Sequence, residues 1–150
     1  MERKFKVLIG ENEDFGRDCA KELEKSGFEA VLCAKDGNKI ISLLDSQRFD
    51  ALLVDAFMPN ADGIDVLEHI EEGEGEKPLV LILSAVDNQQ FEEQFINAGA
   101  DYYLLKPVTP QSVARKIEKL SMWKSQRKNR ESMPQLDIEV VISDIMRQIG

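Results

Sequence analysis

The chain has 150 residues, and its 28 Asp and Glu side chains against 19 Lys and Arg give a net charge of −9. This length suits one compact domain, and so large an excess of acid argues against binding nucleic acid over the whole surface. No apolar run reaches the ~20 residues of a membrane span, and two cysteines are too few for a disulfide scaffold or a zinc site. The first residues lack the apolar region of a signal peptide, which predicts a cytoplasmic protein.

Short apolar runs alternate with amphipathic segments along residues 1–120. Strands are predicted over the apolar runs, at residues 5–9, 28–34, 51–54, 79–83 and 102–105. Helices are predicted where apolar side chains recur every three or four residues, in stripes that begin at Phe15, Ile40, Ile64, Phe91 and Val113. Five strands that alternate with five helices predict βαβ units, and hence an α/β fold with a parallel sheet covered by helices on both faces.

The charge is unevenly distributed and marks a boundary near residue 120. Residues 1–120 carry a net charge of −10, residues 121–134 carry +3 and residues 135–150 carry −2. Because residues 121–134 are polar, basic and end at Pro134, they are predicted to form a linker. The apolar spacing in residues 135–150 predicts a short amphipathic helix, which either docks on its own domain or begins a second domain.

Polar side chains directly follow four of the predicted strands. Glu11 follows the first strand, Asp55 the third, Ser84 the fourth and Lys106 the fifth. In an open parallel sheet, ligands bind at the carboxyl ends of the strands, so these four side chains are expected to lie at one site.

The residue types at this edge are suited to phosphoryl transfer. An aspartate such as Asp55 can act as a carboxylate nucleophile and form an acyl phosphate. Glu11 can help Asp55 to hold Mg²⁺, which typically uses one or two carboxylates together with phosphate and water. Lys106 can pair with a phosphoryl oxygen, and the hydroxyl of Ser84 can donate a hydrogen bond to another.

Residues 5–120 resemble the receiver domain of two-component response regulators. The resemblance is carried by three pieces in order along the chain, DAFMPNADG (Asp55–Gly63), Ser84-Ala85 and YLLKP (Tyr103–Pro107). It implies a flavodoxin-like, doubly wound (βα)5 sandwich with a five-stranded parallel sheet in the order 2-1-3-4-5. It also implies that Asp55 accepts a phosphoryl group from a histidine kinase or a phosphotransfer protein.

The same resemblance implies roles for the neighbouring residues. Ser84 would be the switch hydroxyl, Tyr103 the rotating switch aromatic and Lys106 the phosphate-binding lysine. The metal ligands would be Glu11, Asp55 and the backbone carbonyl of Phe57. A receiver of this kind assists its own phosphorylation and is not expected to be a turnover enzyme. The face formed by the last two helices and the last strand would be a candidate surface for a homodimer.

The chain departs from this family after the first predicted strand, where the family usually has two adjacent acidic residues. This chain has Gly10, Glu11 and Asn12 there. In one register Gly10 and Glu11 take the two acidic positions, and in the other register Glu11 and Asn12 take them. One carboxylate is lost in either register, which predicts weaker Mg²⁺ binding and slower phosphorylation. Glu13 or Asp14 could compensate only if the loop turned back on itself.

The C-terminal segment and the altered acidic pair leave several functions open. Residues 136–150 resemble the start of the DNA-binding effector domain of the stage 0 sporulation protein A family, which implies a sporulation transcription factor that contacts DNA through a part beyond Gly150. The altered acidic pair favours an alternative, a degenerate receiver that acts as an interaction module without phosphate. A phosphohydrolase of the haloacid dehalogenase type is disfavoured, because that chemistry needs an aspartate two residues after the nucleophile and Phe57 stands there.

Overall fold

The computed structural model describes residues 4–131, in which strands and helices alternate without exception. The strands are β1 (Lys6–Gly10), β2 (Glu29–Cys33), β3 (Ala51–Asp55), β4 (Leu79–Ser84) and β5 (Tyr102–Leu105). The helices are α1 (Glu13–Lys25), α2 (Gly37–Ser46), α3 (Gly63–Glu72), α4 (Gln89–Asn97) and α5 (Pro110–Glu131). The predicted alternation of five strands and five helices is confirmed.

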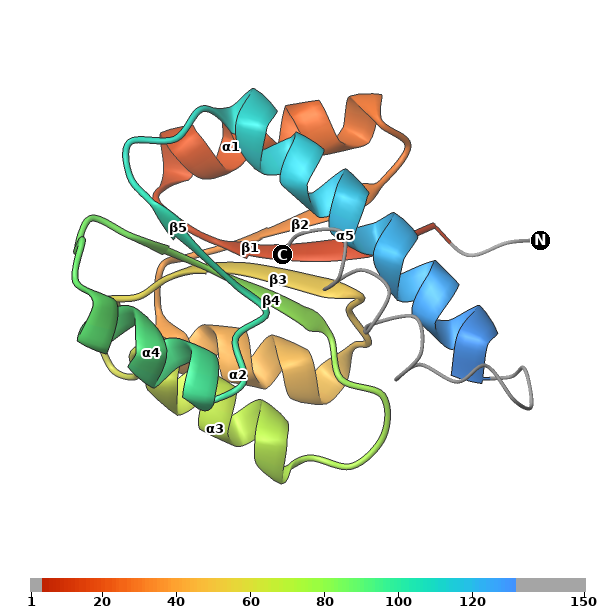
Figure 1. Ribbon diagram of the computed structural model, residues 1–150. Helices are drawn as coiled ribbons and strands as arrows, with labels where there is room; N and C mark the ends of the chain where they lie inside the picture. Colours follow the sequence, from red (N-terminus) through yellow and green to blue (C-terminus); the bar gives the residue numbers. More distant parts are fainter. Residues whose placement is uncertain (1–3, 132–150) are drawn as a thin grey trace, which may run out of the picture. The chain divides into compact units, whose positions relative to one another are not determined.

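All five strands are parallel and stand in the order β2-β1-β3-β4-β5, which confirms the predicted fold class and strand order. Helix α1 and the part of α5 up to Glu118 cover one face of the sheet, and α2, α3 and α4 cover the other (Figure 1). The chain reverses its direction of winding between β1 and β3, and the carboxyl ends of those strands are where an open sheet of this kind binds ligands.

The central strands owe their place to their composition. Every residue of β3 and β4 is buried, as expected for strands covered on both faces. The edge strands β2 and β5 are only partly buried, and β2 begins with the exposed, charged Glu29. The core therefore runs along β3 and β4, and the polar residues at the ends of these two strands are held on a rigid base.

Short polar side chains cap the helices α1 and α3, which follow the carboxyl ends of β1 and β3. The Phe15 N–H donates to the side chain of Asn12 at 3.1 Å, which caps α1. Asp62 and Asp65 form a reciprocal capping box at the start of α3. Because a cap satisfies backbone N–H groups that have no partner within the helix, each of these residues fixes the point where a loop ends.

Helix α5 extends past the predicted domain boundary, through residues 121–131. This segment contains no Gly or Pro and is rich in Lys, Arg and Gln, which favour the helix, and the predicted linker over 121–134 therefore begins within α5. The compact unit that contains the sheet ends at Glu118. Pro134 and the predicted helix over 135–150 lie outside the described residues. In the described part of the chain, no helix is both long and apolar enough to cross a bilayer.

The loops after β2 and β3 are packed directly against each other. A Cβ atom on Gly37 would lie 2.0 Å from the backbone oxygen of Ala61, so only glycine fits there. Asn60 has a φ of 70°, a left-handed conformation that Asn tolerates, and its side-chain amide donates to Asp36 at 2.7 Å. These contacts fix the β2–α2 loop relative to the segment that follows Asp55.

Gly37→Ala should destabilise the protein by roughly 1–3 kcal/mol, because the added methyl group meets backbone that cannot move aside cheaply. Gly73→Ala is the matched control: its Cβ would approach no atom closer than 3.4 Å, and the change should be neutral or slightly stabilising. Urea denaturation of both variants measures the difference, and equal stabilities would show that the two loops are not in such close contact.

Candidate functional site

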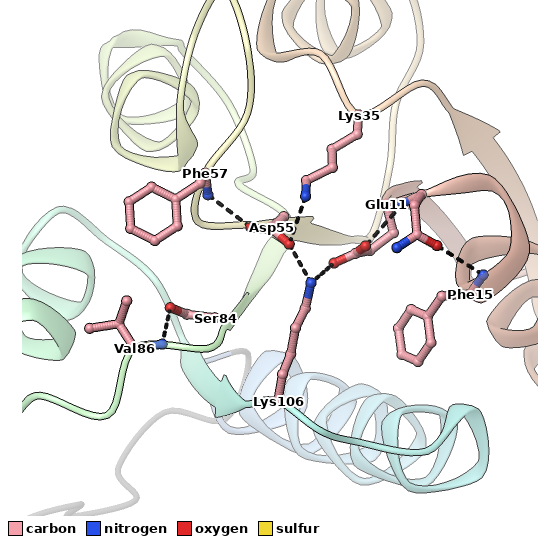
Figure 2. Close-up of polar contacts among 9 residues, drawn as sticks. Glu11, Phe15, Lys35, Asp55, Phe57, Ser84, Val86 and Lys106 are labelled. Carbon is pink, nitrogen blue, oxygen red and sulfur yellow. Dashed lines mark hydrogen bonds and ion pairs between the residues drawn. The ribbon is translucent and has the colours of Figure 1, made fainter.

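The carboxyl ends of β1, β3, β4 and β5 place the other three predicted residues, Glu11, Ser84 and Lys106, around Asp55 (Figure 2). Gly10 pairs with Val54, so Glu11 follows at the level of Asp55, which itself pairs with Leu83. Lys106 directly follows β5, and its backbone N–H donates to the Ser84 carbonyl at 2.8 Å. The order of the parallel strands in the sheet therefore brings together residues that are up to 95 positions apart in the chain.

Asp55 is 4% exposed and is held by three nitrogen atoms. One carboxylate oxygen, Oδ1, accepts the Phe57 N–H at 2.9 Å. The other, Oδ2, forms a short contact with Lys106 Nζ and lies 3.2 Å from Lys35 Nζ. Burial by itself would raise the pKa of Asp55, but Lys106, the Phe57 N–H and Lys35 outweigh it and hold the pKa below its ordinary value. Asp55 is therefore an anion with both oxygens oriented.

The side chain of Glu11 is the second buried carboxylate of the site, at 3% exposure. Its Oε2 accepts the Asn12 N–H at 3.0 Å, and its Oε1 lies 2.9 Å from Lys106 Nζ. Oε1 is buried and has no partner with hydrogen-bond geometry among the described residues. Burial lowers the pKa of Lys106, but its contacts with Asp55 and Glu11 raise it overall, so its ammonium stays charged between the two carboxylates.

The structure separates the two registers that the sequence leaves open for the acidic pair. A Cβ atom on Gly10 would meet Ile40 Cδ1 at 2.4 Å, beneath α2, so a side chain at position 10 would point into the core and away from Asp55. Glu11 therefore takes the first acidic position and Asn12 the second. Asn12 uses its side-chain oxygen to cap α1, where it accepts the Phe15 N–H.

Neither of the next two acidic residues compensates for the lost carboxylate. Glu13 pairs with Arg17 at 2.6 Å, and Asp14 lies 3.9 Å from the same guanidinium group. Both carboxylates are exposed on the first turn of α1. The loop does not turn back, and the site retains two carboxylates, Glu11 and Asp55.

Ser84 and Tyr103 are both bonded to the same residue of the β4–α4 loop. The Ser84 hydroxyl accepts the Val86 N–H at 3.0 Å, and the Tyr103 hydroxyl donates to the Val86 carbonyl at 2.7 Å. The Tyr103 ring is buried against Phe91 and Phe95. Thus the predicted switch hydroxyl and switch aromatic are connected through Val86, although they come from different strands.

Two features of the site were not predicted from the sequence. Lys35 contacts Asp55 from the loop after β2, the one strand end that was not considered, and a polar residue just beyond that strand was the signal that could have identified it. The Phe57 ring stacks on Phe91 at 5.3 Å and is half exposed beside Asp55. An aromatic ring there supplies no second acid, which agrees with the argument against a phosphohydrolase.

The donor set at this edge fits Mg²⁺. Glu11 and Asp55 supply the one or two carboxylates that Mg²⁺ typically uses, and the buried Glu11 Oε1, which is paired with the Lys106 ammonium but accepts no hydrogen bond, is an oxygen that a cation can coordinate. The backbone carbonyl of Phe57 remains a ligand by resemblance only. Among residues 4–131, no group of three or more His, Cys, Asp or Glu side chains is placed to hold a metal ion.

A buried aspartate at the switch point of a doubly wound sheet, with a lysine and a hydroxyl beside it, is the arrangement expected of a receiver domain. The family model of the response regulator receiver domain matches residues 7–118, and the chain belongs to this family. Receiver domains interact with histidine kinases or phosphotransfer proteins and generally bind a divalent cation, usually Mg²⁺.

The relatives of the chain are response regulators. It is 30% identical over 148 residues to the transcriptional regulatory protein CpxR of Escherichia coli (strain K12), which covers 95% of this chain and 62% of CpxR. It is 22% identical over 143 residues to the probable C4-dicarboxylate response regulator DctR of Bacillus subtilis (strain 168), covering 94% and 63% of the two chains. The receiver domain of the Francisella response regulator 1452 aligns with a TM-score of 0.71 at 25% identity, over 79% of this chain and 98% of that one. The chain thus spans less than two thirds of the curated relatives.

The stability of the fold should depend on the charge of Asp55. Because its pKa in the folded state lies below the ordinary value, Asp55 contributes stability above that value, and the contribution is lost as the pH falls through the folded pKa. The wild type should therefore lose free energy of unfolding relative to Asp55→Asn when the pH falls from about 6 to about 3.

Urea denaturation at the two pH values measures this shift. Asp87→Asn, at an exposed position of the β4–α4 loop, is the control and should follow the wild type at both values. A difference between wild type and Asp55→Asn that does not change with pH would contradict the depressed pKa.

Proposed function

We propose that the protein is a phosphorylatable receiver, in which Asp55 accepts a phosphoryl group from a histidine kinase or a phosphotransfer protein. The observation that carries the proposal is the Asp55 carboxylate itself, buried and anionic, with Lys106 against one oxygen and the Phe57 N–H on the other. A carboxylate held in this way can act as a nucleophile toward an incoming phosphorus atom.

In the transfer, an Asp55 carboxylate oxygen forms a bond to phosphorus while the bond between phosphorus and the donor atom breaks. The electron pair of the broken bond leaves with the donor. The Lys106 ammonium group, which lies beside Asp55 Oδ2, then pairs with an oxygen of the phosphoryl group in place of the carboxylate. A divalent cation bound by Glu11 and Asp55 would add positive charge against the phosphoryl oxygens. The protein assists a transfer to itself, so we do not propose a turnover enzyme.

The new group changes the balance of charge at the strand ends. A phosphoryl group carries about −1.5 to −2 charges and several strong acceptor oxygens. Ser84, whose hydroxyl now accepts the Val86 N–H, turns its own O–H toward a phosphoryl oxygen. The β4–α4 loop then moves relative to β4, and the Tyr103 hydroxyl, bonded to the Val86 carbonyl, transmits that movement to β5. The face formed by α4, β5 and α5 is thereby coupled to Asp55.

That face is the surface we propose for a homodimer. Ile96, Tyr102 and Leu105 are apolar side chains that are each more than a third exposed, and they lie on α4, β5 and the end of β5. Lys116 of α5 covers part of the Tyr102 ring at 4.0 Å from the ring centre. A surface of this composition can bury apolar area against a second copy.

The regulated output is a further part of the proposal. We propose that the receiver controls a sporulation transcription factor in the cytoplasm and that DNA is bound by an effector domain beyond Gly150. The sporulation output is supported by the C-terminal sequence alone, because residues 136–150 resemble the effector of that family. The two curated relatives support a longer response regulator, since the chain spans less than two thirds of each.

Incubation with acetyl phosphate and Mg²⁺ should add about 80 Da to the intact mass, the mass of one phosphoryl group. Asp55→Asn should abolish the adduct, because the amide is not a nucleophile of this kind. Asp50→Asn, which changes an aspartate at the other end of β3, is the control and should still be modified. Absence of an adduct in the wild type would favour an interaction module that acts without phosphate, and an adduct that survives Asp55→Asn would place the modification elsewhere.

A further inference from the structure

A second lysine contacts the phosphoacceptor from the β2–α2 loop. Lys35 Nζ lies 3.2 Å from Asp55 Oδ2, the oxygen that also contacts Lys106, and the Lys35 side chain is 34% exposed (Figure 2). Its loop is fixed against the β3–α3 loop by the close approach of Gly37 to Ala61 and by the hydrogen bond from Asn60 to Asp36. The backbone that carries Lys35 is therefore fixed within reach of Asp55.

Lys35 changes the charge of the site. The two buried carboxylates, Glu11 and Asp55, carry −2, and the two lysines in contact with them, Lys35 and Lys106, carry +2. Asn12 at the second acidic position is neutral and serves as the cap of α1. The cluster of these four side chains is thus electrically neutral before any cation enters, whereas a site with three carboxylates and one lysine would carry −2 and match a divalent cation.

A neutral cluster attracts a divalent cation weakly, and an ammonium group at the rim repels it. A divalent cation and a singly charged ammonium group a few ångströms apart repel each other strongly enough to lower the affinity for the cation by roughly tenfold, even near the dielectric constant of water. The same ammonium group attracts the oxygens of a phosphoryl group on Asp55. Lys35 therefore opposes the cation and favours the product of phosphorylation.

We propose that Lys35 is a built-in counter-ion of the phosphoacceptor, which binds the phosphoryl group together with Lys106 and supplies part of the positive charge that a divalent cation would otherwise provide. The inference rests on the proposed function of Asp55. Two consequences follow: the receiver binds divalent cations weakly because of Lys35, and its phosphorylation depends less on the cation than it would without Lys35.

The first experiment measures metal binding directly. Mn²⁺, a paramagnetic ion with the ligand preferences of Mg²⁺, is titrated into the wild-type chain, Lys35→Gln, Lys35→Arg and Lys39→Gln, and free Mn²⁺ is read by electron paramagnetic resonance. Lys35→Gln should bind Mn²⁺ about tenfold more tightly than the wild type, because a repelling charge is gone. Lys35→Arg keeps the charge and should match the wild type. Lys39→Gln removes an equal charge at an exposed position of α2 and should change the affinity less than about twofold.

The second experiment measures phosphorylation by acetyl phosphate, in excess chelator and in saturating Mg²⁺, by intact mass. The quantity compared is the rate of phosphorylation with chelator divided by the rate with Mg²⁺. This ratio should be about tenfold lower in Lys35→Gln than in the wild type, and Lys35→Arg should have the wild-type ratio. An unchanged Mn²⁺ affinity or an unchanged ratio in Lys35→Gln would overturn the role of Lys35. Failure of every variant to gain a phosphoryl group under any condition would instead overturn the proposed function, and the Mn²⁺ titration would still decide how Lys35 acts on the cation.

Discussion

The ammonium group of Lys106 lies between the carboxylates of Glu11 and Asp55, and the rest of the site is arranged around this contact. Two carboxylates that are almost fully buried and lie close to each other repel, and each loses its hydration, so they can both stay ionised only beside a cation. The parallel sheet provides the geometry, because β1, β3 and β5 end at the same edge. The loop after β2 adds Lys35, which completes the neutralisation of the pair.

This arrangement explains how one side chain can have both a structural and a chemical role. In the unmodified protein, Lys106 and Lys35 stabilise an anionic Asp55 that is otherwise costly to bury. In the proposed phosphoryl transfer, the charge moves outward onto the phosphoryl group, the same ammonium groups remain within reach of it, and no new cationic side chain has to enter. The hydroxyls of Ser84 and Tyr103 are both bonded to Val86, so the proposed turn of the Ser84 hydroxyl toward a phosphoryl group would break the first of these bonds and alter the β4–α4 loop.

The fold could be predicted from the sequence because its signals are local and repeated. Apolar runs such as those of β3 and β4, separated by amphipathic segments, suffice for an alternating parallel sheet, and the order of the strands followed from the resemblance. The extent of α5 was harder to predict: polar and basic residues are typical of a linker, but several of them are also good helix formers, and only the absence of Gly and Pro from residues 121–131 indicated that the helix continues. For the site, the residues after four strands were identified by their position alone. Lys35 carried the same positional signal after β2, but its contact with Asp55 also depends on how two loops pack, with Gly37 against Ala61, and that packing is not encoded in any short segment. The role of Gly10 also needed coordinates, since the direction of its absent side chain is set by the strand register.

The most direct test of this account is a crystal structure of the chain with beryllofluoride, a stable analogue of the phosphoryl group, bound under phosphorylating conditions. The account predicts beryllofluoride on an Asp55 carboxylate oxygen, with Lys106 and Lys35 both in contact with its fluorine atoms and the Ser84 hydroxyl turned from Val86 toward it. Beryllofluoride on Asp55 with Lys35 directed into solvent would contradict the charge balance described for this site, and its absence from Asp55 would contradict the assignment of the phosphoacceptor.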